Sequence, residues 1–127
     1  MSRKKILLVD DSNTILMMEK FILRNGPYEL VTASNGEEGV RKAAEHQPDL
    51  ILLDVIMPKM GGFEACRLIR GREETKSIPI IMVTTRGEAA NVEAGWANGC
   101  TDYVTKPINS IELLAKVRNF LGDGACQ

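Results

Sequence analysis

The sequence is poor in the residues that build disulfide frameworks and zinc sites. Its 127 residues include one histidine and three cysteines, Cys66, Cys100 and Cys126. The cysteines are odd in number, widely spaced and without a Cys-x-x-Cys pair, which excludes a zinc set and a disulfide-stapled domain. We expect free thiols in a reducing cytosol.

Neither sign of charge dominates the chain. Lys and Arg number 16 and Asp and Glu number 17, so the formal net charge is -1. A domain that wraps nucleic acid carries a clear basic excess, so we expect no direct contact with nucleic acid. The apolar run at residues 6–9 is too short for a signal peptide or a membrane span. We therefore expect a cytoplasmic protein that does not insert into a membrane.

The glycine-rich phosphate-binding runs GxGxxG and GxxxxGK[ST] are also missing, which argues against nucleotide binding by these motifs. The length is that of one compact domain. The content of 44% apolar and 26% charged residues is typical of a soluble globular protein. We expect one domain over residues 3–121, followed by a tail or the start of a linker at 122–127.

Short apolar runs alternate with helical patterns along the chain. The runs lie at residues 6–9, 30–33, 50–53, 78–83 and 103–104. Ile15, Met18 and Ile22, with neighbouring Leu16 and Phe21, mark an amphipathic first helix. Capping boxes at 34–37 and 109–112 begin the second and last helices, and an alanine-rich fourth helix is predicted over 88–98. Five strand–helix units predict an α/β fold, with an open, parallel, doubly wound sheet covered by helices on both faces.

Polar residues follow four of the predicted strands. Asp10 and Asp11 end the first strand, Asp54 the third, Thr84 the fourth and Lys106 the fifth. Each residue alone is explained by a turn or a helix cap. The carboxyl ends of parallel strands meet at one edge, however, so we expect the set to converge.

Three converging carboxylates repel one another unless cations compensate them. Oxygen ligands without Cys or His favour a hard ion, and Mg²⁺ is the cytosolic default. At such a site Asp54 can act as a nucleophile towards phosphorus and form an aspartyl phosphate. Lys106 and the Thr84 hydroxyl can bind the remaining phosphoryl oxygens. The residues therefore predict phosphorylation-controlled signalling.

Taken together, these residues resemble the response-regulator receiver domain of two-component phosphorelays over about residues 3–121. The motifs that carry the resemblance are Asp10-Asp11, Asp54 with Met57-Pro58 and Gly61-Gly62, Thr84, and Tyr103 ahead of Lys106-Pro107. The resemblance implies a flavodoxin-like sheet of strand order 2-1-3-4-5 and a cis peptide bond before Pro107. It also implies phosphotransfer from a histidine kinase or a histidine phosphotransfer protein, and an unidentified downstream protein target.

The resemblance assigns roles at the site. Asp54 is the phospho-acceptor, and Asp11 binds Mg²⁺ directly, with Mn²⁺ as a substitute. Asp10 binds the metal through water, and the Ile56 main-chain carbonyl completes the protein ligands. Phosphorylation draws Thr84 inward and lets Tyr103 turn from an outward to an inward rotamer. This change remodels the face formed by the fourth helix, the fifth strand and the last helix. We expect a signalling module that is not a metabolic enzyme.

Three positions depart from common choices in this family. Ile56 replaces a polar residue that helps to position attacking water, which predicts a long-lived phosphoryl group. Thr85 is larger than the usual Ala or Gly and narrows access to the site. Arg86 either contacts the phosphoryl group or is solvated. On the predicted fourth helix, Val92 and Trp96 are expected to face outward near Tyr103 as an anchor for a partner.

Two alternatives remain open. A docking module on the same scaffold would act without phosphorylation. A Mg²⁺-dependent phosphatase of the haloacid dehalogenase type needs a second Asp two positions after the nucleophile. Ser12 and Ile56 occupy the two candidate positions, which argues against that enzyme.

Overall fold

The structure, a computed structural model, describes residues 3–57, 60–85, 93 and 96–122. Its strands are β1 (Lys4–Val9), β2 (Tyr28–Ala33), β3 (Leu50–Asp54), β4 (Ile80–Thr85) and β5 (Asp102–Lys106). All are parallel and form one sheet in the order β2-β1-β3-β4-β5, which confirms the expected strand order.

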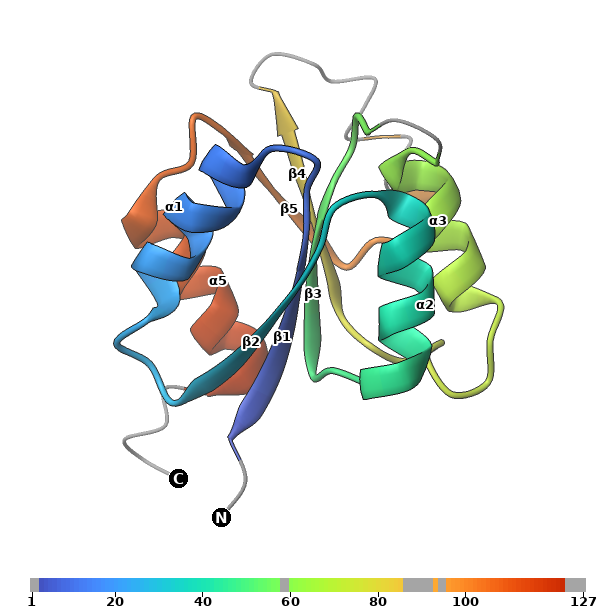
Figure 1. Ribbon diagram of the computed structural model, residues 1–127, viewed down its shortest axis with the longest axis horizontal. Coiled ribbons are helices and arrows are strands. Elements are labelled where there is room, and N and C mark those ends of the chain that lie inside the picture. Colours follow the sequence, from blue (N-terminus) through green and yellow to red (C-terminus); the bar gives the residue numbers. More distant parts are fainter. Residues whose placement is uncertain (1–2, 58–59, 86–92, 94–95, 123–127) are drawn as a thin grey trace.

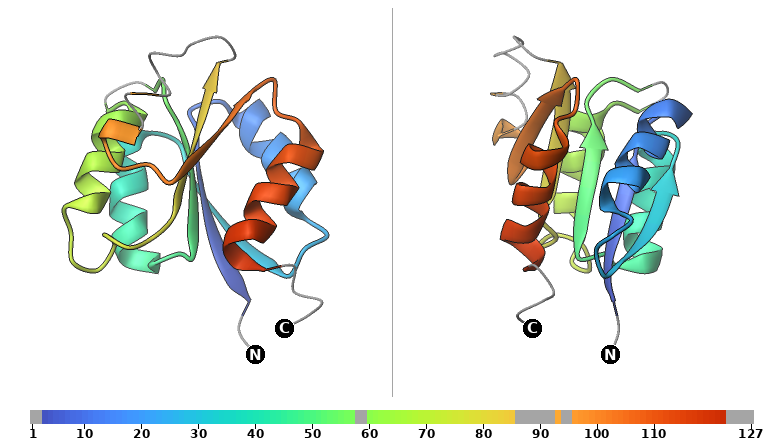
Figure 2. Two further views of the ribbon diagram at one scale, coloured as in Figure 1. Left: turned by 180° about the vertical axis from the view of Figure 1, so that it is seen from behind. Right: turned by 90° about the vertical axis from the view of Figure 1, so that its left-hand side faces the viewer.

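The helices are α1 (Asn13–Leu23), α2 (Gly36–His46), α3 (Gly62–Arg70) and α5 (Ser110–Leu121). Helical backbone also occurs at residues 93 and 96–97, while most of the predicted fourth helix lies outside the described residues. Helices α1 and α5 cover one face of the sheet, and α2 and α3 cover the other (Figures 1 and 2). The predicted doubly wound architecture is confirmed.

The central strands are buried on both sides, which explains their continuous apolar runs. All five residues of β3 are buried. Ile6, Leu8, Leu52, Val83 and Val104 belong to the core cluster that includes residues of α1 and α5. Leu7, Val9, Leu53 and Met82 belong to the cluster that includes residues of α2 and α3. Because successive side chains of a strand alternate between faces, this division fixes the direction of the residues that follow.

Polar side chains cap three of the helices. Ser12 caps α1, and Asn109 caps α5 by accepting a hydrogen bond from the backbone N–H of Glu112 at 3.0 Å. The box expected at 34–37 is displaced by one residue. Asn35 accepts from the N–H of Glu38, whose carboxylate in turn accepts from Ser34. Each such cap contributes about 1 kcal/mol.

The buried stripe of α1 differs from the predicted one. Leu16, Glu19 and Leu23 face the interior, whereas Met18 and Phe21 are exposed. The three buried positions are spaced three and four residues apart and therefore share one side of the helix. The expected stripe was wrong at Met18 and Phe21, whereas Leu16 is buried and Ile22 packs against the core cluster.

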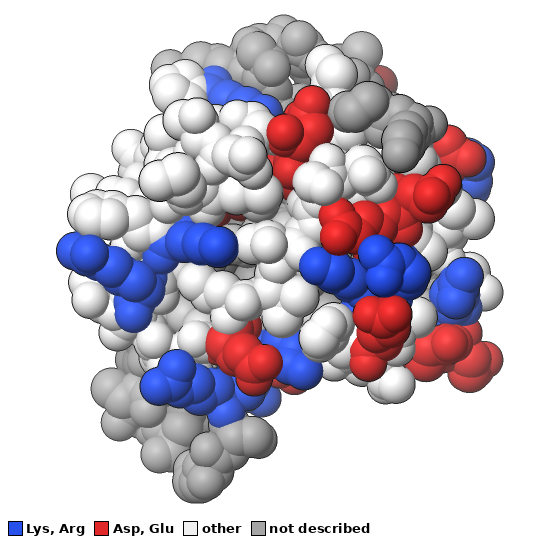
Figure 3. All heavy atoms as spheres, viewed as in Figure 1, with Lys and Arg blue, Asp and Glu red and all other residues white. Residues whose placement is uncertain are grey.

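The surface charges are mixed on the face drawn in Figure 3, where blue and red groups alternate over α2. They include the ion pairs of Arg41 with Glu38 and Glu45, and of Lys42 with Glu38. Among the described residues of this face, the basic groups alternate with acidic ones and form no continuous basic stripe of the kind that binds nucleic acid. None of the described helices has the length and apolar character needed to cross a bilayer.

Candidate functional site

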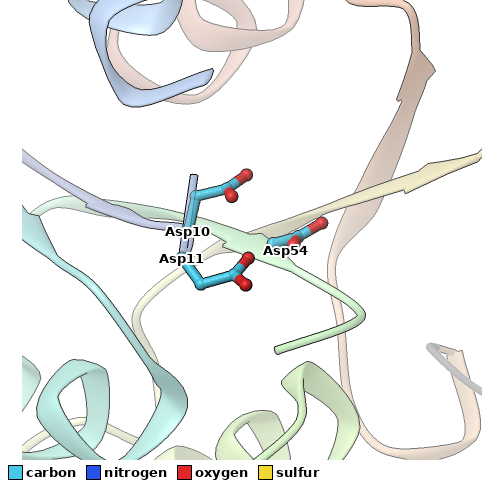
Figure 4. Close-up of side chains that lie close together, drawn as sticks. All are labelled: Asp10, Asp11 and Asp54. Carbon is cyan, nitrogen blue, oxygen red and sulfur yellow. The ribbon is translucent and has the colours of Figure 1, made fainter. Parts of the chain in front are cut away.

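Three carboxyl groups meet where β1 and β3 end. Val9 pairs with Leu53 in the sheet, so Asp10 and Asp54 follow at the same level on neighbouring strands. Figure 4 shows the side chains of Asp10, Asp11 and Asp54 directed to the same side. One oxygen from each lies within 4.8 Å of the others. Asp10 and Asp54 are only 1% and 4% exposed, whereas Asp11 is exposed.

Lys106 brings a positive charge from the end of β5. Its Nζ lies 2.9 Å from Asp54 Oδ1 and 3.8 Å from Asp10 Oδ2. Asp10, Asp54 and Lys106 continue the strand positions that face α1 and α5, so their side chains extend to the same side of the sheet. The peptide bond from Lys106 to Pro107 is cis, as expected.

Burial and the neighbouring charges shift the pKa values of Asp10, Asp54 and Lys106. Burial raises the pKa of Asp10 from 3.8 to about 6, against the lowering effect of a hydrogen bond from the Ser12 N–H. Burial also raises the pKa of Asp54, although its hydrogen bond with Lys106 opposes this effect. Burial alone would lower the pKa of Lys106, but its hydrogen bond with Asp54 and the nearby negative charges raise it. The ammonium group therefore stays protonated at neutral pH.

A divalent cation would relieve the remaining repulsion. Asp10 Oδ2 is buried and has no hydrogen-bond partner among the described residues. The donors offered by the three aspartates are all oxygen, as hard cations such as Mg²⁺ prefer. The residues present therefore fit a magnesium ion.

Thr84 and Tyr103 lie on the face of the sheet opposite to that of Asp10 and Asp54. Met82 pairs with Tyr103 and Thr84 with Thr105, so Thr84 and Tyr103 lie on adjacent strands and share one face. Thr84 is 3% exposed, and its Oγ1 has no partner within the described part of the chain. Tyr103 packs against the core cluster below α2 and α3.

Six of the residues predicted from the sequence line one cleft of about 250 Å³: Asp10, Asp11, Asp54, Ile56, Thr84 and Lys106. Ser12, Val55 and Val83 complete its lining. The Ile56 side chain is 69% exposed. The apolar side chain therefore reaches into solvent beside the cleft.

Gly62 lets the chain turn tightly behind Asp54. Its N–H donates to the Val55 carbonyl at 2.8 Å. A Cβ at Gly62 would lie 2.1 Å from the Asp54 carbonyl oxygen, whereas one at Gly61 would lie 3.4 Å from its nearest neighbour. The second glycine is thus required by a close backbone approach.

The other predicted residues lie away from the cleft or outside the described chain. Trp96 is 47% exposed, and its ring meets the Tyr103 ring edge-on with 6.2 Å between centroids. Val92, Arg86 and the side chain of Thr85 lie outside the described residues.

Sequence reasoning missed Glu19. It is 1% exposed, and its Oε1 has no hydrogen-bond partner among the described residues. Burial raises its pKa from 4.5 to about 8, and the charges of Asp10 and Asp54 add to the effect. Glu19 lies three residues after Leu16 and four before Leu23, and this spacing could have indicated that it shares the buried side of the helix with them.

Comparison with known proteins agrees with this geometry. Residues 6–118 match the family model described as the response regulator receiver domain. The chain is 40% identical over 118 residues to the alkaline phosphatase synthesis transcriptional regulatory protein PhoP of Bacillus subtilis (strain 168). That match covers 93% of this chain and 48% of PhoP, so the chain spans about half the length of this relative.

Two further relatives are similar over nearly their whole length. Protein PilH of Pseudomonas aeruginosa is 36% identical over 117 residues, which cover 92% of this chain and 97% of PilH. The receiver domain of the sensor histidine kinase PA1611 from Pseudomonas aeruginosa PAO1 is 30% identical, with a TM-score of 0.88. The match covers 95% of this chain and 99% of that domain, whose crystal structure has a magnesium ion coordinated in the active site cleft. The chain belongs to the response regulator receiver domain family.

Proposed function

We propose that the chain takes a phosphoryl group onto Asp54 and signals by changing the face around β5. The observation that carries this proposal is the position of Asp54, nearly buried at the cleft and 2.9 Å from the Lys106 ammonium. A carboxylate oxygen of Asp54 attacks the phosphorus of a phosphohistidine, and a phosphorus–oxygen bond forms. The phosphorus–nitrogen bond breaks, its electron pair stays on the imidazole, and that nitrogen takes up a proton.

Asp11, Asp54 and the Ile56 main-chain carbonyl would hold Mg²⁺ directly, and Asp10 would hold it through water, with Mn²⁺ as a substitute. When bound, the ion neutralises charge on the phosphoryl oxygens during transfer. The magnesium in the cleft of the PA1611 receiver domain supports this assignment. The unpartnered Asp10 Oδ2 supports it from the chain itself.

Lys106 and Thr84 bind the phosphoryl group once it is on Asp54. The Lys106 ammonium already lies beside Asp54 and needs only a small movement to reach a phosphoryl oxygen. The Thr84 hydroxyl has no partner within the described part of the chain and is free to donate to another. Hydrogen bonds from these two groups to phosphoryl oxygens form only after phosphorylation. Movement of Thr84 makes room for Tyr103 to change rotamer, because both lie on the same side of adjacent strands.

The partners follow from this chemistry. A histidine kinase or a histidine phosphotransfer protein supplies the phosphoryl group. A downstream protein reads the face formed by β5, α5 and the predicted fourth helix, where Trp96 is exposed. This domain makes no direct contact with nucleic acid and releases no small-molecule product other than phosphate from its own slow hydrolysis.

Intact mass spectrometry tests the proposal. The protein is incubated with acetyl phosphate and Mg²⁺, or with EDTA in place of Mg²⁺. We expect a gain of one phosphoryl group that is labile in base, needs Mg²⁺ and disappears in Asp54→Asn. The matched variant Asp49→Asn, at an exposed position before β3, retains the gain. An unchanged mass in the wild type would refute the proposal and favour a docking module that works without phosphorylation.

A further inference from the structure

Tyr103 is held on two sides by residues of other elements. The Trp96 ring, just before the turn at residues 98–99, meets it edge-on at an interplanar angle of 85°. The Lys116 Nζ, from α5, lies 4.9 Å from the centroid of the tyrosine ring. Edge-on aromatic pairs and cations over an aromatic face are both attractive arrangements. Tyr103 thereby links the end of the predicted fourth helix to α5.

The ammonium group of Lys116 is itself fixed in place. It donates hydrogen bonds to the Tyr103 main-chain carbonyl and to Asp102 Oδ1, the latter at 3.2 Å. Its Nζ also lies 3.9 Å from Glu112 Oε2. These partners are backbone or neighbouring side chains, so they stay in place when the tyrosine ring moves. A change of Tyr103 rotamer therefore loses the ring contact without releasing Lys116.

We propose that Trp96 and Lys116 are positioning residues that hold Tyr103 in the rotamer seen here, and so restrain signalling before phosphorylation. The inference rests on the proposed function, in which Tyr103 changes rotamer. A rotamer that turns the ring away from Trp96 and Lys116 gives up both ring contacts. Removal of the Lys116 cation should shift the rotamer equilibrium about two- to fivefold. Removal of the Trp96 ring should shift it about two- to tenfold.

Fluorine NMR of the whole chain labelled with 3-fluorotyrosine measures this equilibrium. The chain has two tyrosines, and Tyr103→Phe identifies the signal of interest. Spectra are recorded with Mg²⁺, before and after addition of beryllofluoride, which mimics a phosphoryl group. In Lys116→Met we expect the signal without beryllofluoride to move towards its activated position. Lys116→Arg keeps a cation over the ring and should stay close to the wild type.

Two further variants sharpen the result. Trp96→Leu should shift the population in the same direction, judged against its own activated spectrum because loss of the indole itself moves the signal. Lys20→Met removes an exposed lysine from α1 and should change nothing. If neither Lys116→Met nor Trp96→Leu has a larger activated population before beryllofluoride is added, and neither needs less beryllofluoride for activation, the inference is wrong.

The mass assay separates this inference from the proposed function. If the wild type gains a phosphoryl group while the unactivated populations of both Lys116→Met and Trp96→Leu match that of the wild type, the inference fails and phosphorylation stands. If no protein gains mass, the proposed function fails. A shift in unactivated Lys116→Met that is absent from Lys116→Arg supports the restraint of Tyr103 in either case.

Discussion

Replacement of Glu19 by glutamine should make the protein more stable at neutral and mildly alkaline pH. Glutamine keeps the shape of the side chain but carries no titratable group. In the folded protein the Glu19 carboxyl is buried on α1, and its pKa is raised to about 8. In the unfolded chain its pKa returns to 4.5. The folded state therefore binds the proton more tightly than the unfolded state does.

The sign and size of the effect follow from proton linkage. As the pH rises from 4.5 towards about 8, the unfolded state loses the proton first, so the stability of the wild type falls. Each unit of pKa difference is worth about 1.4 kcal/mol. The advantage of Glu19→Gln should therefore grow by about 3 kcal/mol between about pH 5 and about pH 7.5.

Urea unfolding at several pH values, with EDTA present, measures this difference. Contributions of groups far from Glu19 cancel when the free energies of unfolding are subtracted, whereas the coupling of Glu19 to Asp10 and Asp54 stays in the difference. Glu64→Gln, at an exposed position of α3, is the control and should show little change with pH. A stability difference between Glu19→Gln and wild type that stays constant over this range would show that Glu19 is ionised normally in the fold.

Two other variants test the surroundings of Asp54. Ile56→Asn should speed the loss of phosphate from the isolated phosphorylated protein on the order of tenfold, or about 1.4 kcal/mol of activation barrier, since asparagine can position water. Ile111→Asn changes another exposed isoleucine and should leave the half-life of the phosphorylated protein unchanged in the same mass assay. Equal half-lives in the wild type and both variants would contradict the role of Ile56. Gly62→Ala should lower the free energy of unfolding by about 2–4 kcal/mol, because its Cβ would overlap a backbone oxygen. Gly61→Ala, which has room for a Cβ, should lose little, and similar urea midpoints for both alanine variants would refute the argument.

The strands and helices could be predicted because the sequence patterns that indicate them are local. The apolar run of β3 and the asparagine cap of α5 require no knowledge of distant residues. The boundaries were less certain. Strand β4 begins at Ile80, after Pro79, although the apolar pattern begins at Ile78. Proline has no N–H to donate to a neighbouring strand, so regular pairing starts after it.

The convergence of residues at the cleft could also be inferred from the sequence, because parallel strands end at one edge. The direction of each side chain depends on register as well. Asp54 and Lys106 reach each other because Asp54 pairs with Val83 and Lys106 with Thr85, two strands apart along the sheet. A shift of one residue in β5 would turn Lys106 to the opposite face. Register comes from packing on both faces, so the 2.9 Å contact required the structure.

Glu19 and the contact of Lys116 with Tyr103 mark where sequence reasoning ended. Each depends on how two elements distant in the chain are placed against each other. A helical pattern assigns apolar residues to the buried side, so it passes over a carboxyl group in the same stripe. The Glu19 carboxyl lies within electrostatic reach of Asp10, Asp54 and Lys106. The charge state of Glu19 therefore depends on the charges at the cleft and influences them in turn. A description limited to the residues at the strand ends would omit this acidic group.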